Sequence, residues 1–88
     1  VNYDEALKMF ERGNIVRSIK GRDKGKLSVV FSYQDNKVYI VDGKEHKLTK
    51  PKLKNPKHVE SLKLNIDERF LIGNERLRKE LNRLKNEI

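Results

Sequence analysis

Short runs of β-branched and aromatic residues alternate with turn-forming residues through the first two thirds of the chain. Three such runs cover residues 15–19, 27–31 and 38–41, and each has the length of a strand. Residues 45–49 and 58–64 continue the pattern and predict a fourth and a fifth strand. In the fifth strand we expect Val59, Leu62 and Leu64 to be buried. Five short strands at this spacing indicate a mainly β fold, namely a small five-stranded barrel.

Glycine, asparagine and aspartate mark the reversals between these strands. Gly21 and Gly25 bracket a tight turn after the first strand, because glycine takes positive φ without steric cost. Residues 34–37 (QDNK) predict a hairpin between the second and third strands, and residues 42–43 (DG) predict another after the third. Two prolines flank the lysine-rich part of residues 50–57, which we expect to be extended and solvated, since proline cannot join a central strand.

The C-terminal part of the sequence has helical periodicity. Leu77, Leu81, Leu84 and Ile88 fall at i, i+4, i+7 and i+11, so one face of the predicted helix is apolar. Asn74 is the expected N-cap, because its side chain can accept a free N–H group of the first turn. The leucine stripe packs either on the barrel or on a partner, and the pattern alone leaves both open.

The first twelve residues read as a separate extension. Tyr3, Leu7 and Phe10 fall at i, i+4 and i+7, which predicts a short helix or helical turn before Gly13. The predicted organisation has three parts: an extension at 1–12, a barrel at 13–66, and a linker with a helix at 67–88.

The positive charge is concentrated in the part of the chain predicted to be β-structure. The 21 Lys and Arg exceed the 13 Asp and Glu, giving a net charge of +8. Residues 1–11 carry one cation and three acids, residues 64–88 carry six and five, and residues 12–63 carry fourteen and five, a local excess of +9. A general bias toward lysine, serving solubility, would not leave the C-terminal helix nearly neutral. We therefore favour a functional basic face.

Two groups of cations are candidates for that face, and we expect them to contact nucleic-acid phosphates. Lysine acts as a point charge, whereas Arg17 and Arg22 can also bind bidentately or stack on bases. The predicted RNA-binding residues are Arg17, Lys20, Arg22, Lys24 and Lys26 around the first turn, and His46, Lys47, Lys50, Lys52, Lys54 and Lys57 in and beside the proline-flanked segment.

Other polar and aromatic residues are better explained by structure than by chemistry. Asp23 is expected to accept hydrogen bonds from the next backbone amides of its turn. Tyr33 and Tyr39 could stack on bases, but the alternation favours packing, and His58 is expected to satisfy a hydrogen bond where a strand begins. His46 and His58, without cysteine or a convincing carboxylate partner, do not make a metal-ligand set.

Size and motif content argue against an enzyme. A chain of 88 residues buries only roughly 60% of its unfolded surface and makes one domain. The sequence has no phosphate-binding loop, nucleophile elbow or paired catalytic carboxylates, so we expect no catalytic residue, cofactor or metal. It has no apolar run near the roughly 20 residues of a membrane span and no signal-peptide core, so we expect a cytoplasmic monomer that does not contact membranes.

From Gly13 to the C-terminal helix the sequence resembles the KOW-motif proteins. The signature is a Gly-turn-Gly motif between two barrel strands, here Gly13, Val16, Gly21 and Gly25. More narrowly, the segments GNIVRSIKGRDKG, VVFSYQDNKVYIVDG and HKLTKPKLKNPKHVESL look like the archaeal and eukaryotic-type large-subunit ribosomal protein fourteen family and its small bacterial relatives. The resemblance implies an SH3-like barrel, ribosomal RNA as the ligand and no catalytic activity.

Some parts of the chain depart from that family, and other functions stay open. The first twelve residues do not match and the C-terminal helix is short, so a ribosome-associated factor is an alternative to a permanent ribosomal protein. A second alternative is a protein-interaction module that docks on a ribosomal or polymerase protein through Leu77, Leu81 and Leu84. A third is an accessory factor of transcription elongation. Salt-insensitive association would favour the protein-interaction module, because apolar burial and counterion release respond differently to salt.

Overall fold

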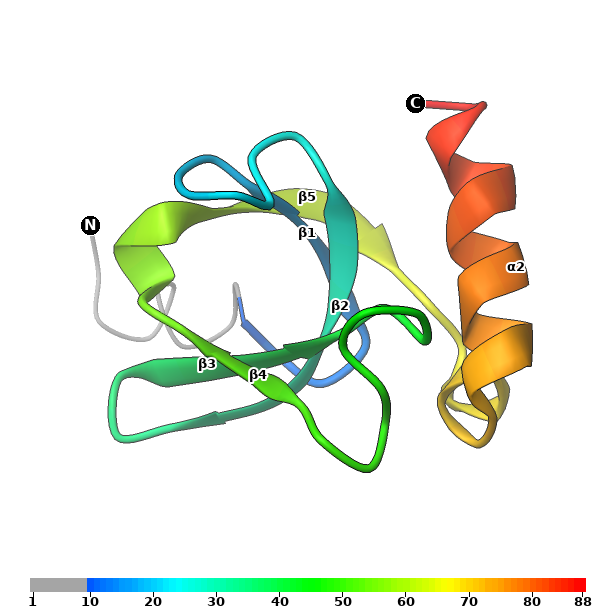
Figure 1. Cartoon of the computed structure of the whole chain (residues 1–88), viewed down its shortest axis with the longest axis horizontal. Helices are drawn as coiled ribbons and strands as arrows, with labels where there is room; N and C mark the ends of the chain where they lie inside the picture. The colour runs from blue at the N-terminus through cyan, green and yellow to red at the C-terminus, as the bar shows by residue number, and fades with distance from the viewer. Residues whose placement is uncertain (1–9) are drawn as a thin grey trace.

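The computed structural model describes residues 10–88, which form a curved antiparallel sheet with a helix beside it (Figure 1). The strand order across the sheet is β4-β3-β2-β1-β5. This confirms the mainly β, five-stranded, barrel-like fold with a C-terminal helix, while the predicted N-terminal helix lies outside the described residues. In chain order the elements are β1 (Asn14–Ser18), β2 (Leu27–Gln34), β3 (Lys37–Val41), β4 (Lys52–Lys54), the 3-10 helix η1 (Pro56–His58), β5 (Val59–Asn65), the 3-10 helix η2 (Glu68–Leu71) and α2 (Asn74–Lys85).

The first two reversals follow the turn chemistry of the sequence. Asp35 and Asn36 have φ of 51° and 61°, the left-handed backbone that joins β2 to β3 in a tight hairpin. Gly21 and Gly25 have φ of 85° and 90°, and the Gly25 N–H donates to the Ser18 carbonyl at 2.7 Å. Both turn predictions are confirmed. The turn bracketed by Gly21 and Gly25 places residues 22–24 at the tip of its loop.

Two apolar clusters cover opposite faces of the sheet. Neighbouring residues of one strand, such as Ile15 and Val16 or Val29 and Val30, belong to different clusters, which is why the strands read as continuous apolar runs. One cluster packs β1, β2 and β3 against α2 and contains Ile15, Val29, Val41, Ile66, Leu71, Leu77 and Leu81. The other contains Phe10, Val16, Val30, Val38, Ile40 and Val59.

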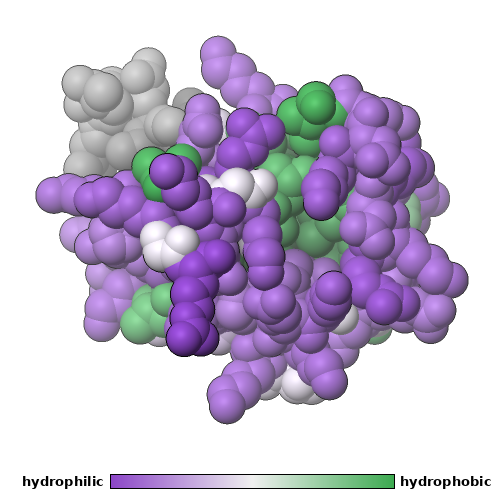
Figure 2. Space-filling view, turned by 45° about the horizontal axis from the view of Figure 1, so that its top comes forward, coloured by the Kyte–Doolittle hydropathy of each residue, from purple (hydrophilic) through white to green (hydrophobic). Residues whose placement is uncertain are grey.

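The C-terminal helix packs on its own sheet. Leu77 and Leu81 are buried in the first cluster, Leu84 is half-buried against it, and only Ile88 of the predicted stripe is largely exposed, at 51%. The sequence left open whether this face meets the barrel or a partner, and the structure assigns it to the barrel. Among residues 10–88 no helix is long and apolar enough to cross a membrane. Hydrophilic residues cover most of the face drawn in Figure 2.

The predicted fourth strand at residues 45–49 is wrong. Those residues form bends and turns, because the Asp42 carboxylate accepts hydrogen bonds at 2.8 Å from the N–H groups of both Lys44 and His46. The same contacts replace the hairpin predicted at residues 42–43. The fourth strand is instead β4, which lies in the proline-flanked segment and pairs with β3 at the edge of the sheet. This segment is extended, as predicted, but an edge strand tolerates flanking prolines where a central strand would not.

Three smaller predictions also need correction. Asn74 is the first residue of α2 and not its cap, which is Gly73. The Asn74 Oδ1 atom instead accepts a hydrogen bond from the Leu48 N–H at 2.8 Å, so the side chain ties the loop after β3 to the helix. Leu64, expected to be buried in β5, is 41% exposed, and Ile19 lies beyond the end of β1 and is 39% exposed.

Candidate nucleic-acid interface

The two loop segments that carry most of the predicted cations meet at one end of the sheet. Because neighbouring strands are antiparallel, the C-terminal ends of β1 and β3 and the N-terminal ends of β2 and β4 lie at the same end of the sheet. The loop at residues 19–26 therefore meets the segment at residues 42–57, although they are far apart in the sequence. We call the surface that these two segments form the loop face.

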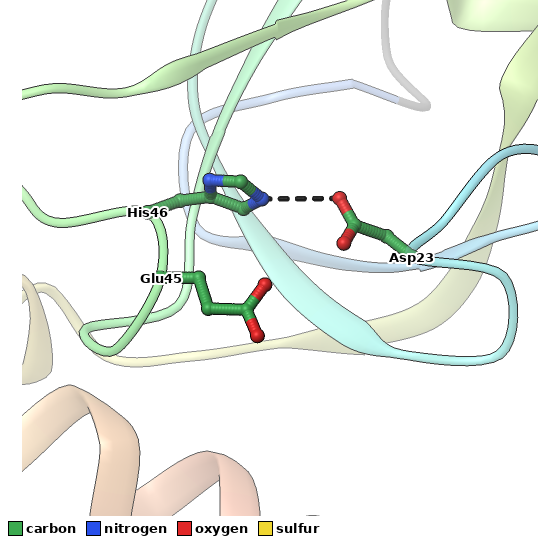
Figure 3. Close-up of side chains that lie close together, drawn as sticks. All are labelled: Asp23, Glu45 and His46. Carbon is green, nitrogen blue, oxygen red and sulfur yellow. Dashed lines mark hydrogen bonds and ion pairs between the residues drawn. The ribbon is translucent and has the colours of Figure 1, made fainter.

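Charged side chains connect the two segments of the loop face (Figure 3). The Asp23 Oδ2 atom lies 3.0 Å from His46 Nε2 and 3.7 Å from Lys54 Nζ. Next to these three residues, Lys26 Nζ lies 3.0 Å from Glu45 Oε1. We refer to these five residues as the inter-loop cluster.

The inter-loop cluster includes three of the eleven predicted RNA-binding residues. The side chains of His46 and Lys54 are only 17% and 12% exposed, and both face the Asp23 carboxylate. Lys26 is exposed but is paired with Glu45. Their contacts hold the two segments together, so they are less available to an RNA phosphate than the other cations.

The eight remaining candidates are available to a ligand. Seven are exposed and Arg17, on β1, is half-buried. Within residues 10–88 none of the eight has an acidic side chain within ion-pairing distance. They are Arg17, Lys20, Arg22, Lys24, Lys47, Lys50, Lys52 and Lys57.

Asp23 has the structural role predicted for it, but with different partners. Its carboxylate reaches across to His46 and Lys54, whereas the sequence pattern predicted hydrogen bonds to the next backbone amides. The hydrogen bond from His46 lowers the pKa of Asp23 below its ordinary value, and the positive charges of Lys54 and Lys26 add to this effect against the opposing effect of burial. The carboxylate is therefore ionised at neutral pH and balances the cations beside it.

The inter-loop cluster also contains a possible set of metal ligands. One ligand atom each from Asp23, Glu45 and His46 lies within 4.8 Å of the others. Sequence patterns alone pointed to no carboxylate partner for His46, because Asp23 is 23 residues away and is brought near only by the strand order. Lys26 and Lys54 already pair with the two carboxylates, so a divalent cation would have to displace ammonium groups. The charges favour a polar connection between loops over a metal centre.

The tyrosines considered for base stacking contact the protein itself. The Tyr33 ring stacks on Phe10 with centroids 5.6 Å apart, and its hydroxyl lies 3.2 Å from Asn36 Oδ1. Tyr39 is half-buried on β3, where it pairs with Leu53 of the edge strand. These contacts agree with the packing role that the alternation favoured.

No protein-family model matches the chain, and none of the curated proteins is significantly similar to it. The resemblance to KOW-motif proteins therefore stays a prediction that rests on the residues quoted for it. What the geometry adds is a group of cations that have no acidic partner within residues 10–88 and that lie on loops meeting at one end of a small β fold, an arrangement suited to binding a polyanion.

Proposed function

We propose that this protein is a non-enzymatic RNA-binding protein that binds structured RNA through the loop face. The observation that carries the proposal is the convergence of residues 19–26 and 42–57, which together present eight cations without acidic partners within residues 10–88. These eight are Lys44 and all of the available candidates above except Arg17, which lies on β1. Each cation that replaces a counterion at a phosphate adds to affinity, so a cluster binds far better than scattered charges do.

The arrangement of these cations favours recognition of backbone shape over base sequence. They stand on turns, on the 3-10 helix η1 and on the short edge strand β4, and no helix or strand of the loop face presents an ordered row of base-reading side chains. Phosphate contacts position a protein on a nucleic acid and carry little sequence information. A folded RNA with closely spaced phosphates is the ligand class that such a surface fits.

The choice of ribosomal RNA as the ligand rests on the resemblance of the sequence to large-subunit ribosomal protein fourteen. We propose that the protein is ribosome-associated and acts in translation. Docking on another protein through the leucine stripe receives no support, because Leu77 and Leu81 are already buried between α2 and the sheet in the first apolar cluster.

Competition among nucleic acids tests the proposal. The affinity of the purified protein is measured for large-subunit ribosomal RNA, an unrelated structured RNA and duplex DNA across a salt series. We expect ribosomal RNA to bind more tightly than both others at physiological salt. Weak binding to all three that disappears together as salt rises would contradict the proposal and favour a protein partner.

A further inference from the structure

A groove lies next to the loop face, between the barrel and α2. Its volume is about 200 Å³, below the roughly 300–1,000 Å³ of sites for drug-sized ligands. Three segments line it: residues 25–27, where β2 begins, the loop after β3 through Asp42, Lys44 and Glu45, and the side of α2 that carries Arg78 and Asn82. In Figure 2, hydrophobic surface is visible in a hollow between hydrophilic side chains of the barrel and of α2.

The packing of the loop after β3 sets the shape of this groove. Gly43 has φ of 78°, and a Cβ atom at this position would lie 2.2 Å from the Asn74 carbonyl oxygen and 3.1 Å from the Arg78 nitrogen. The loop therefore rests directly on the backbone of α2, which fixes Lys44 and Glu45 at the rim. At the opposite wall Gly25 has no atom within 4 Å of where its Cβ would be, so that side stays open.

The groove combines an apolar floor with a cationic rim. Leu27 and Leu81 supply the apolar surface, and the amide of Asn82 can both donate and accept hydrogen bonds. Four cations and two carboxylates stand at the rim, and one pair of these, Lys26 with Glu45, is already an ion pair. Within residues 10–88 the other three cations have no acid within ion-pairing distance; they are Lys44, Arg78 and Lys85.

We propose that this groove accepts an unpaired nucleotide that bulges from the RNA bound on the loop face. A base has a flat apolar surface and polar edges, which match the leucine floor and the Asn82 amide, while its phosphates match the cationic rim. A paired helix is too wide to enter a space of this volume. Gly25 and Lys26 belong to both the groove and the loop at residues 19–26, so a strand leaving the groove passes directly onto the loop face.

This inference rests on the proposed RNA-binding function and is tested with two RNA hairpins. They share one sequence, but one carries a single unpaired 2-aminopurine nucleotide in its stem. We expect the wild-type protein to bind the bulged hairpin roughly tenfold more tightly, within the range that stacking of one base produces. Aminopurine fluorescence should change on binding, because the base moves from solvent into the groove.

A matched pair of variants locates the effect. Asn82→Phe places a bulky uncharged side chain at an exposed groove position and should abolish the preference while leaving affinity for the paired hairpin unchanged. Asn86→Phe makes the same substitution at an exposed position outside the groove and should keep the preference. Arg78→Gln removes a rim charge without adding bulk and should reduce the preference, which keeps the test valid should Asn82→Phe not fold.

The outcomes separate this inference from the function on which it rests. Tight binding of both hairpins with no preference for the bulge would overturn the groove proposal and leave RNA binding by the loop face intact. A preference that survives Asn82→Phe in a folded protein would place the base elsewhere and also overturn it. Failure to bind either hairpin, or any structured RNA, would contradict the proposed function and the groove proposal with it.

Discussion

α2 and the loop face are attached to the same sheet by different forces. α2 is held by apolar burial, with Leu77 fully buried and Leu81 nearly so. The side chains of the two loop-face segments are held to each other by hydrogen bonds and ion pairs around Asp23 and Glu45. Apolar burial is insensitive to pH and strengthened by many salts, whereas charge pairs respond to both. The attachment of α2 should therefore dominate stability, and the inter-loop cluster should shape the binding surface at a smaller energetic contribution.

The largest effect should come from removing the apolar contact of α2. Leu77→Ala leaves a cavity in the first apolar cluster and should lower the free energy of unfolding by about 2–5 kcal/mol. Ile72→Ala is the control, because Ile72 is 72% exposed and its truncation should change stability by less than about 0.5 kcal/mol. Urea denaturation measures both, and equal effects would show that α2 is not anchored by this burial.

The contact of the loop after β3 with α2 should rank next. Gly43→Ala places a methyl group against the helix backbone and should lower the free energy of unfolding by roughly 1–3 kcal/mol. Gly25→Ala shares the positive φ but meets no atom within 4 Å, so it should cost only about 1 kcal/mol. Thermal unfolding followed by circular dichroism compares the two. A Gly43→Ala protein as stable as Gly25→Ala would contradict the close packing of this loop.

Removing the central carboxylate of the inter-loop cluster should have a smaller effect that depends on pH. Asp23→Asn removes the carboxylate that accepts a hydrogen bond from His46 and pairs with Lys54, and should lower the free energy of unfolding by about 1–2 kcal/mol at neutral pH. The folded-state pKa of Asp23 is lowered, so its contribution is present above the unfolded pKa of about 3.9 and is lost as pH falls through the lower folded pKa.

The wild-type protein and Asp23→Asn should accordingly approach each other in stability below about pH 4. Denaturation of both proteins from pH 7 to pH 2 measures the difference. A constant difference across that range would mean that the ionised carboxylate is not what stabilises the two loops.

The smallest effect should come from the exposed ion pair of the same cluster. Lys26→Met removes the partner of Glu45 at a solvent-exposed position and should leave the midpoint of urea denaturation unchanged within error. It should still weaken RNA binding slightly, because one cation is lost from the margin of the loop face. A clear loss of stability would show that exposed charges contribute more to this fold than we infer.

Local signals explain what the sequence predicted well. The Asp35-Asn36 hairpin, the glycines of the first turn and the leucine spacing of α2 each depend on residues that are close in sequence. The fourth strand was misplaced because the side chain of Asp42 bends its own loop, a contact that hydrophobic patterning does not register.

The missed features of the candidate site all depend on long-range contacts. The Asn74 side chain accepts a hydrogen bond from the Leu48 N–H and does not cap its own helix. Asp23 contacts His46 only because the strand order brings two loops to the same end of the sheet. A surplus of lysine in the sequence predicts a basic surface, but it does not reveal which cations have acidic partners. Lys26 and Lys54 were therefore grouped with Lys24 and Lys52, although the structure gives the two pairs different surroundings.

The most direct test of the loop face compares two double charge reversals in RNA binding. Arg22→Glu with Lys24→Glu alters the first loop, and Lys37→Glu with Arg76→Glu alters exposed cations on the β2–β3 hairpin and on α2. Each reversal removes two charge units, so both variants fall from +8 to +4. Circular dichroism first establishes that both variants fold like the wild type.

The decisive quantity is the slope of log K against log salt for large-subunit ribosomal RNA. We expect the loop-face variant to lose affinity sharply and its slope to shrink by about 1.4–1.8, the value for two lost phosphate contacts, while the control stays near the wild type. Equal losses in the two variants would mean that net charge alone drives binding, and would contradict the loop face as the RNA-binding surface.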